Sequence, residues 1–187
     1  MDGSGVVGYR YDRPTVDDGA GMFQVAVDSN GLDVNSPYAY LLWCRDFAQT
    51  TVVARDATTM VGFTTAYIRT EMPDTVMIWQ QAVTEAHRNR GLGAGMITEL
   101  LTKRLPLGIR YLEATVGPSN VAPTRILANV AQQYDSRVVR RPLFEQRVFP
   151  QGIVHDDEIL IRVGPDRKSG SAGMPRPRME SRMPSSA

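Results

Sequence analysis

The sequence has one cysteine, Cys44, among its 187 residues, and this scarcity limits where and how the protein works. A single cysteine cannot form an intrachain disulfide, so we expect a reducing compartment. Its place in an apolar helical pattern favours a packing role over a catalytic one. The chain also lacks an apolar run long enough to span a bilayer, and its first residues lack the basic and apolar pattern of a signal peptide. We therefore expect a cytoplasmic protein with no membrane partner.

Charge of one sign is also scarce, because the formal net charge is +1. Residues 165–187 are rich in Pro, Ser, Gly, Met and Arg and carry about +3, which leaves about −2 for the rest of the chain. A near-neutral body lacks the basic stripe that binds nucleic acid, so we expect no nucleic-acid partner. The composition predicts flexible residues 1–8, one domain over residues 9–164 and a disordered basic tail over residues 165–187.

Strand and helix patterns alternate along the domain. Thr15, with Asp18 three residues later, has the spacing of a capping box before a first helix, and Ser36 followed by Pro37 is typical of a helix start. The further expected elements are a helix over residues 38–48, strands over 51–55, 60–68 and 75–83, a helix from Leu92, a strand over 111–116, a helix over 123–134, and strands over 138–141 and 159–163. Residues 75–116 thus form a crossover unit, which favours an α/β (α+β) fold with ligands at the carboxyl ends of the strands.

The loop Arg88-Asn89-Arg90-Gly91-Leu92-Gly93 joins the third of these strands to the helix. A helix start offers unpaired N–H groups and a positive dipole, and glycines with arginines beside it suit a pyrophosphate. The loop lacks the lysine and hydroxyl residue of a nucleotide-triphosphate P-loop, and Met96 replaces the third glycine of a dinucleotide fingerprint. The hexapeptide alone leaves two interpretations open: an anion site, or a glycine-rich turn with solvated arginines.

Arg-x-x-Gly-x-Gly from Arg88 to Gly93 resembles the acyl-CoA pyrophosphate loop of the GNAT acetyltransferases. Further segments are similar to one family within that superfamily, the L-2,4-diaminobutyrate acetyltransferases of ectoine synthesis. They are Leu32-Asp33-Val34-Asn35-Ser36-Pro37-Tyr38-Ala39-Tyr40-Leu41-Leu42, Pro73-Asp74-Thr75 with Trp79-Gln80, Tyr111-Leu112-Glu113-Ala114-Thr115-Val116 with Pro118-Ser119-Asn120, and Phe149-Pro150 with His155 and Glu158. The resemblance implies a single GNAT-like domain whose central, mostly antiparallel mixed sheet has splayed fourth and fifth strands and flanking helices. It also implies a homodimer, with acetyl-CoA as co-substrate and no metal.

The resemblance further implies two sets of site residues. The expected cofactor-binding residues are Ala82, Val83, Arg88, Asn89, Arg90, Gly91, Leu92, Gly93, Ala94, Gly95 and Asn120. The expected acceptor-binding residues are Asp33, Asn35, Tyr38, Trp79, Thr115, His155 and Glu158, with catalytic roles for Asp33, Tyr38 and Glu158. Strand alternation with Met77 and Gln81 would turn Trp79 toward the acceptor groove. Alone, each acid has a structural alternative, and the resemblance favours an active-site role for Asp33 and Glu158 while the role of Glu113 stays open.

The sequence departs from the superfamily pattern in two places. Where many members carry a tyrosine that protonates the departing thiolate, this chain has Leu127, so water or Tyr134 would serve instead, or the thiolate leaves unprotonated. Pro123 stands at an expected helix start and could shift it. The resemblance implies transfer of an acetyl group from acetyl-CoA to the γ-amino group of L-2,4-diaminobutyrate. The alternatives are acetylation of another small amine or amino acid, or a non-catalytic CoA-binding module.

Overall fold

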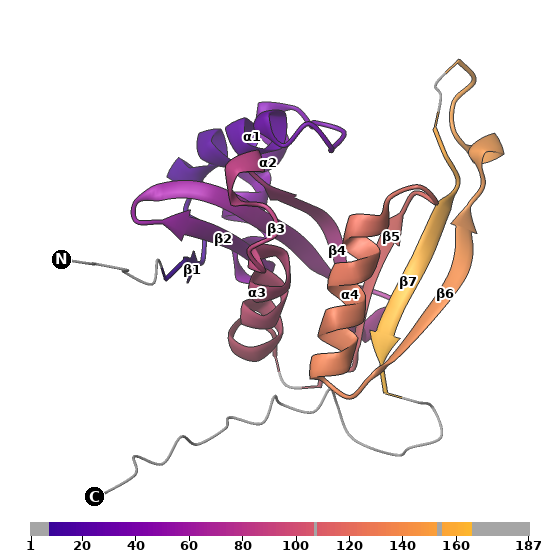
Figure 1. Cartoon of the computed structure of the whole chain (residues 1–187). Helices are drawn as coiled ribbons and strands as arrows, with labels where there is room; N and C mark the ends of the chain where they lie inside the picture. Colours follow the sequence, from indigo (N-terminus) through magenta and orange to yellow (C-terminus); the bar gives the residue numbers. More distant parts are fainter. Residues whose placement is uncertain (1–7, 107, 153–154, 166–187) are drawn as a thin grey trace, which may run out of the picture.

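A twisted sheet of seven strands, in the order β1-β2-β3-β4-β5-β7-β6, forms the centre of the molecule (Figure 1). The computed structural model describes residues 8–106, 108–152 and 155–165. The strands are β1 (Arg10–Asp12), β2 (Thr51–Asp56), β3 (Thr59–Arg69), β4 (Met72–Val83), β5 (Tyr111–Val116), β6 (Arg137–Phe144) and β7 (Glu158–Gly164). The helices are α1 (Gly19–Asp28), α2 (Pro37–Arg45), α3 (Leu92–Glu99) and α4 (Val121–Gln133).

The expected mixed sheet is confirmed, because β4 and β5 pair in parallel and the other neighbouring strands pair antiparallel. The parallel pairing runs only from Thr75 opposite Tyr111 to Ile78 opposite Ala114. β4 continues beyond it to Val83 and β5 to Val116, so the two strands separate at their carboxyl ends. The predicted splay of these strands is therefore present.

Helices cover the sheet on both faces. On one face α1 and α2 enclose a small core that includes Met22, Tyr40 and Phe63. On the other, α3 and α4 pack on a larger core that includes Met96 and Leu127. Beside this two-sided core, β6 forms the outer edge of the sheet, and all of its residues are exposed (Figure 1). Within the described ranges, no helix is long and apolar enough to cross a membrane.

Several predicted boundaries differ from the structure. The second helix ends at Arg45 rather than at residue 48, where a separate 3-10 turn (Ala48–Thr50) begins. The first helix follows a 3-10 turn (Val16–Asp18), and the Asp18 carboxylate accepts the Thr15 backbone N–H at 2.9 Å, as a capping box requires. β1 was not expected, because three residues carry too little periodicity to be recognised. The expected flexible start and disordered tail fall almost entirely outside the described residues.

Candidate active site

The gap between β4 and β5 exposes backbone groups of β4. Gln80 donates its N–H to Thr65 Oγ1 at 3.0 Å, and Thr84 donates its N–H to Val61 O at 2.9 Å, so both peptide groups turn toward β3. Peptide groups alternate along a strand, so those of Ala82 also face β3 and those of Gln81 and Val83 face the gap. Of the two expected backbone donors, Val83 therefore borders the gap, whereas Ala82 is turned away from it.

A β-bulge sets this alternation. Thr65 pairs with Gln80 and Ala66 with Ile78, which leaves Trp79 as the extra residue in β4. Trp79 stacks on Trp43 of α2, with the ring centroids 6.5 Å apart. Gln81 instead donates to Gly93 O at 3.1 Å, on the side of α3. The expectation that Trp79 and Gln81 share a face was wrong, because the bulge shifts the phase of the strand between them.

Gly91 is the N-cap of α3 and has φ at +79°, a left-handed conformation that favours glycine. Asn89 also has positive φ, at +60°. The first intrahelical bond runs from the Gly95 N–H to Gly91 O at 2.9 Å, so the N–H groups of Leu92, Gly93 and Ala94 precede the hydrogen-bonded part of the helix. These three N–H groups suit an anion, whereas that of Gly95 is already bonded.

At Gly93 and Gly95, close packing against neighbouring side chains requires glycine. A Cβ at Gly93 would lie 2.8 Å from Ile126 Cδ1 and 2.9 Å from Gln81 Oε1. A Cβ at Gly95 would overlap the hydroxyl of Tyr11. Gly93 thus lets α3 approach α4, and Gly95 lets it approach β1.

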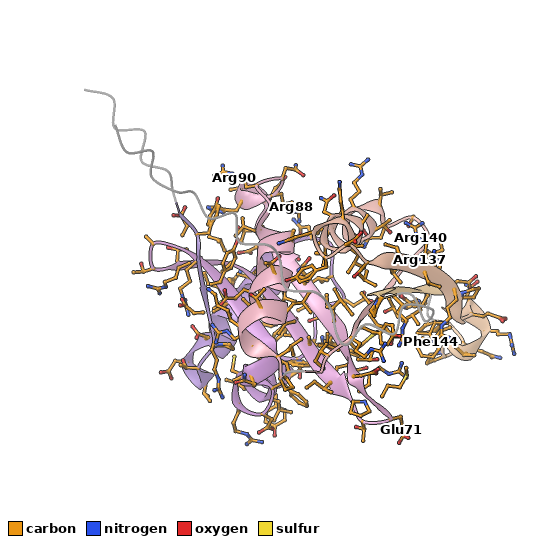
Figure 2. The ribbon with its side chains drawn as sticks, turned by 90° about the horizontal axis from the view of Figure 1, so that it is seen from below. Glu71, Arg88, Arg90, Arg137, Arg140 and Phe144 are labelled. Atoms are coloured by element: carbon orange, nitrogen blue, oxygen red, sulfur yellow. The ribbon has the colours of Figure 1, made fainter. Side chains whose placement is uncertain are left out.

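The two loop arginines differ in their partners, although both lie near the start of α3 (Figure 2). Arg88 donates from Nε to Val83 O at 3.3 Å and from Nη2 to Ser29 O. Arg90 is exposed and donates from Nη1 to Tyr9 OH at 3.2 Å. Both arginines are exposed, but Arg88 bonds two backbone carbonyls and so braces the end of β4, whereas Arg90 bonds a side-chain hydroxyl.

Asn120 lies across the gap from this loop, at the N-cap of α4. Its side chain is exposed, and its backbone N–H donates to Gly117 O at 3.0 Å. Pro123 occupies the first turn of the helix, where no intrahelical N–H bond is required. The helix begins regularly at Val121, so the expected disturbance by this proline is absent.

The loop before α2 is fixed by its backbone. Gln80 Nε2 donates to Asp33 O at 2.8 Å, and the Tyr40 hydroxyl donates to Gln80 Oε1 at 3.3 Å and accepts the Asn35 N–H at 3.4 Å. These bonds hold the loop against β4 and leave the Asp33 carboxylate exposed. Tyr38 is 65% exposed at the start of α2. The loop thus presents an acid and a phenol on the α2 side of the sheet.

A hollow of about 480 Å³ lies beside Trp79 on this side. Its lining residues are Asn35, Ala39, Trp43, Phe47, Tyr67, Ile68, Thr70 and Trp79. This volume is within the range of small-molecule sites. Aromatic rings that border such a space can attract an ammonium group through their faces.

The remaining expected acceptor residues come from β5 and the segment before β7. Thr115 pairs with Leu160, and Glu158 begins β7. His155 Nε2 lies 3.8 Å from Glu158 Oε1, and its ring stacks on Phe149 with centroids 3.8 Å apart. The stacking fixes the ring, so His155 can orient the carboxylate of Glu158. Glu113, whose role the sequence left open, is fully buried and accepts bonds from two arginines.

Several proteins of known function are similar to this chain in sequence. The L-2,4-diaminobutyric acid acetyltransferase of Streptomyces avermitilis is 48% identical over 161 residues, which cover 84% of this chain and 89% of that protein. The enzyme of the same name from Streptomyces coelicolor is 46% identical over 156 residues, with 82% and 91% covered. The Acetyltransferase (GNAT) family model matches residues 20–126. The chain belongs to the GNAT acetyltransferase family.

A solved structure from the GNAT family resembles this acetyltransferase in fold and in sequence. The diaminobutyrate acetyltransferase EctA of Paenibacillus lautus, in complex with its substrate L-2,4-diaminobutyric acid and coenzyme A, matches it with a TM-score of 0.81 and 33% identity. The match covers 85% of this chain and 96% of the other. The resemblance inferred from short motifs thus extends over the whole domain.

Tyr134 and Cys44, which sequence reasoning considered for chemistry in this acetyltransferase, are both buried. Tyr134 is buried at the far end of α4, and at 1.5 Å per residue it lies about 20 Å along the helix axis from Asn120. Burial raises the pKa of its hydroxyl to about 12, so it is a poor acid for the thiolate. Leu127 is buried in the core. Burial also raises the pKa of the Cys44 thiol to about 11, which opposes a nucleophilic role.

Sequence reasoning missed Gln81 as a bordering residue of this GNAT site. Its backbone faces the gap, and its side chain donates to Thr64 Oγ1 at 2.7 Å as well as to Gly93 O. The side chain thereby joins β3, β4 and the first turn of α3. No periodicity signal could have found it, because the bulge at Trp79 sets its direction.

Proposed function

We propose that this protein transfers the acetyl group of acetyl-CoA to the γ-amino group of L-2,4-diaminobutyrate, as a step of ectoine biosynthesis. The observation that carries the proposal is the identity of 48% over 161 residues with the diaminobutyric acid acetyltransferase of Streptomyces avermitilis. The splayed strands and the glycine N-cap of α3 support it, because they suit a thioester arm and an anion, and the exposed Asp33 lies in the loop that Gln80 of β4 holds.

The donor site fits acetyl-CoA. The N–H groups of Leu92, Gly93 and Ala94, with the charge of Arg90 beside them, would hold the pyrophosphate. The backbone of Val83, in the gap, would bond the pantetheine arm, and Asn120 would contact the arm from the side of α4. Of the remaining expected cofactor-binding residues, Asn89 and Gly91 would shape the loop through their positive φ angles, and Arg88 would tie the loop to β4 through its bond to Val83 O.

The acceptor must lose a proton before it reacts, since an alkyl ammonium has a pKa of about 10 and no free electron pair. In the proposed mechanism Asp33 or Glu158 receives this proton, directly or through water, with Tyr38 nearby as a hydrogen-bonding group. The neutral amine then attacks the thioester carbon in a ternary complex. The Gln81 N–H would stabilise the oxyanion, and the C–S bond breaks as the amine nitrogen gives up its second proton to water. Water, rather than Tyr134, would return a proton to the thiolate.

Substrate comparison tests the proposal. Turnover of acetyl-CoA should be fast with L-2,4-diaminobutyrate and slow with ornithine, lysine and polyamines. Binding of acetyl-CoA without turnover of any amine would instead support a non-catalytic module.

Variants of the two acids test their roles. Asp33→Asn and Glu158→Gln should each lower kcat/KM, by at least ~100-fold for the acid that receives the proton, while the affinity for acetyl-CoA stays near that of the wild type. Asp135→Asn is the matched control, because Asp135 is an exposed acid beyond the C-terminal end of α4, and asparagine tolerates its positive φ. Near-normal turnover in both acid variants would remove Asp33 and Glu158 from the site.

A homodimer in the cytoplasm is part of the proposal. β6 supports the dimer, since Val139 and Phe144 are both at least half exposed on this outer strand, at whose end Figure 2 labels Phe144. Light scattering coupled to size-exclusion chromatography would measure the mass, and Phe144→Glu should shift a dimer toward the monomer. A wild-type mass of about 21 kDa would exclude the dimer, since one chain is 20.7 kDa.

A further inference from the structure

Glu113 is an ionisable side chain with no exposed surface in the middle of β5. Its Oε2 accepts from Arg69 Nη1 at 2.8 Å and its Oε1 from Arg162 Nη1 at 2.6 Å. One guanidinium is enough to neutralise one buried carboxylate. Two guanidiniums therefore leave a net charge of about +1 around Glu113, and neutralising this carboxylate does not require the second arginine.

The excess charge is directed outward. The side chains of Arg69 and Arg162 are 34% and 19% exposed, whereas that of Glu113 is 1% exposed. The Arg162 guanidinium lies over the ring of Tyr111, 3.7 Å from its centroid, which fixes its plane. Each guanidinium has five N–H donors, so the bonds to Glu113 leave donors for a further anion.

These arginines share a sheet face with the proposed acceptor residues. Leu112, Ala114 and Val116 pack in the core beneath α3 and α4, so alternation places Glu113 and Thr115 on the opposite face. Trp79 faces the same side, toward α2. Arg162 pairs with Glu113 while Leu160 pairs with Thr115, so the charged group begins about 7 Å along the strands from the level of Thr115.

We propose that Arg69 and Arg162, held in place by Glu113, bind the α-carboxylate of the acceptor and make the enzyme select an amino acid over a plain diamine. This inference rests on the proposed function. The acceptor carries two ammonium groups and one carboxylate. Asp33 and Glu158 supply negative charge for the ammonium groups, and the two arginines supply positive charge for the carboxylate. Fork-shaped guanidinium donors match a carboxylate in geometry as well as in charge.

A comparison of two acceptors tests the inference. L-2,4-Diaminobutyrate and 1,3-diaminopropane share the reacting amine, but the second lacks the carboxylate. Arg69→Gln should lower kcat/KM for diaminobutyrate roughly 10- to 100-fold, mostly through KM, as expected for a lost hydrogen bond to a charged group. The value for diaminopropane should change by less than about 3-fold, which is within ordinary context dependence. If diaminopropane turns over too slowly to measure, its inhibition constant Ki in the assay with diaminobutyrate is compared between wild type and variant instead of kcat/KM.

Controls separate recognition from folding. Arg45→Gln removes an exposed arginine at the end of α2 and should leave the ratio of the two acceptors at the wild-type value. Arg69→Lys keeps the charge and an ion pair with Glu113, so it remains testable if Arg69→Gln unfolds, and it should give a smaller shift of the same ratio. Equal losses with both acceptors, or an unchanged ratio in both Arg69 variants, would overturn the inference. A wild-type protein that acetylates neither acceptor would instead refute the proposed function.

Discussion

Gly91 allows a direct test of how the loop prepares an anion site. Its φ of +79° is left-handed, and a Cβ built at this position meets no atom within 4 Å. Gly91→Ala therefore adds backbone strain without a steric clash. A non-glycine residue in the left-handed region costs about 1–2 kcal/mol.

This cost appears either in stability or in affinity. If the substituted alanine were held left-handed in the free protein, the unfolding midpoint would fall by roughly 2–8 °C, the shift expected for 1–2 kcal/mol in a chain of this size. If the free loop relaxes instead, the strain returns when CoA binds, and Kd rises roughly 5- to 30-fold. Calorimetric titration with CoA and thermal unfolding of the same samples measure both quantities. The loss in unfolding free energy and the loss in CoA binding free energy should together equal the backbone strain of about 1–2 kcal/mol.

Gly91→Asn is the matched control. Asparagine tolerates left-handed backbone better than alanine, and Asn89 already adopts it two residues earlier. Both substitutions reduce the freedom of the unfolded chain, so that effect largely cancels between them. Gly91→Asn should stay close to the wild type in both measurements. If Gly91→Ala matched Gly91→Asn in stability and in CoA affinity, the left-handed start of α3 would play no part in cofactor binding.

Three further variants follow from burial and charge. Cys44→Ala should keep kcat within about 2-fold, because a buried thiol of raised pKa is no nucleophile; loss of turnover in a folded variant would contradict this. Tyr134→Phe should keep both activity and stability, since the buried hydroxyl has no hydrogen-bond partner in the part of the chain that is described. Burial raises the pKa of Asp18, but bonds from Thr15 and Arg55 outweigh it and lower the pKa below the usual 3.8. Asp18→Asn should therefore lose stability above pH 4, and its deficit in urea unfolding should shrink as the pH falls further; a deficit independent of pH would exclude an ionic origin.

The sequence predicted those parts of the fold that depend on local pattern. The strand before Arg88 and the helix from Leu92 appear as expected from such patterns, and the separation of β4 from β5, which only the family resemblance implied, is also present. The direction of single residues in β4 was less predictable, because one bulge at Trp79 reverses the phase for Gln81 and Ala82. A bulge depends on the pairing with β3, which no window of β4 contains.

The partners of charged residues were not predictable for a related reason. Arg88 was expected to bind the cofactor, and in the structure its guanidinium also bonds Val83 O and Ser29 O. Ser29 is 59 residues away in the chain. Glu113 could not be assigned either, because its two partners come from β3 and β7. Such contacts arise only when distant strands assemble, so they leave no trace in local spacing.

The glycines of the loop show why the hexapeptide alone did not identify a ligand. Gly91 supplies a left-handed helix start, Gly93 supplies room for Ile126 of α4, and Gly95 supplies room for Tyr11 of β1. Only the first requirement concerns the direction of the free N–H groups, and the other two concern packing. A glycine-rich turn that merely joins a strand to a closely packed helix would show two of the same three glycines. The choice between a turn and an anion site therefore depends on the gap between β4 and β5, where the backbone of Val83 extends the line of donors away from α3.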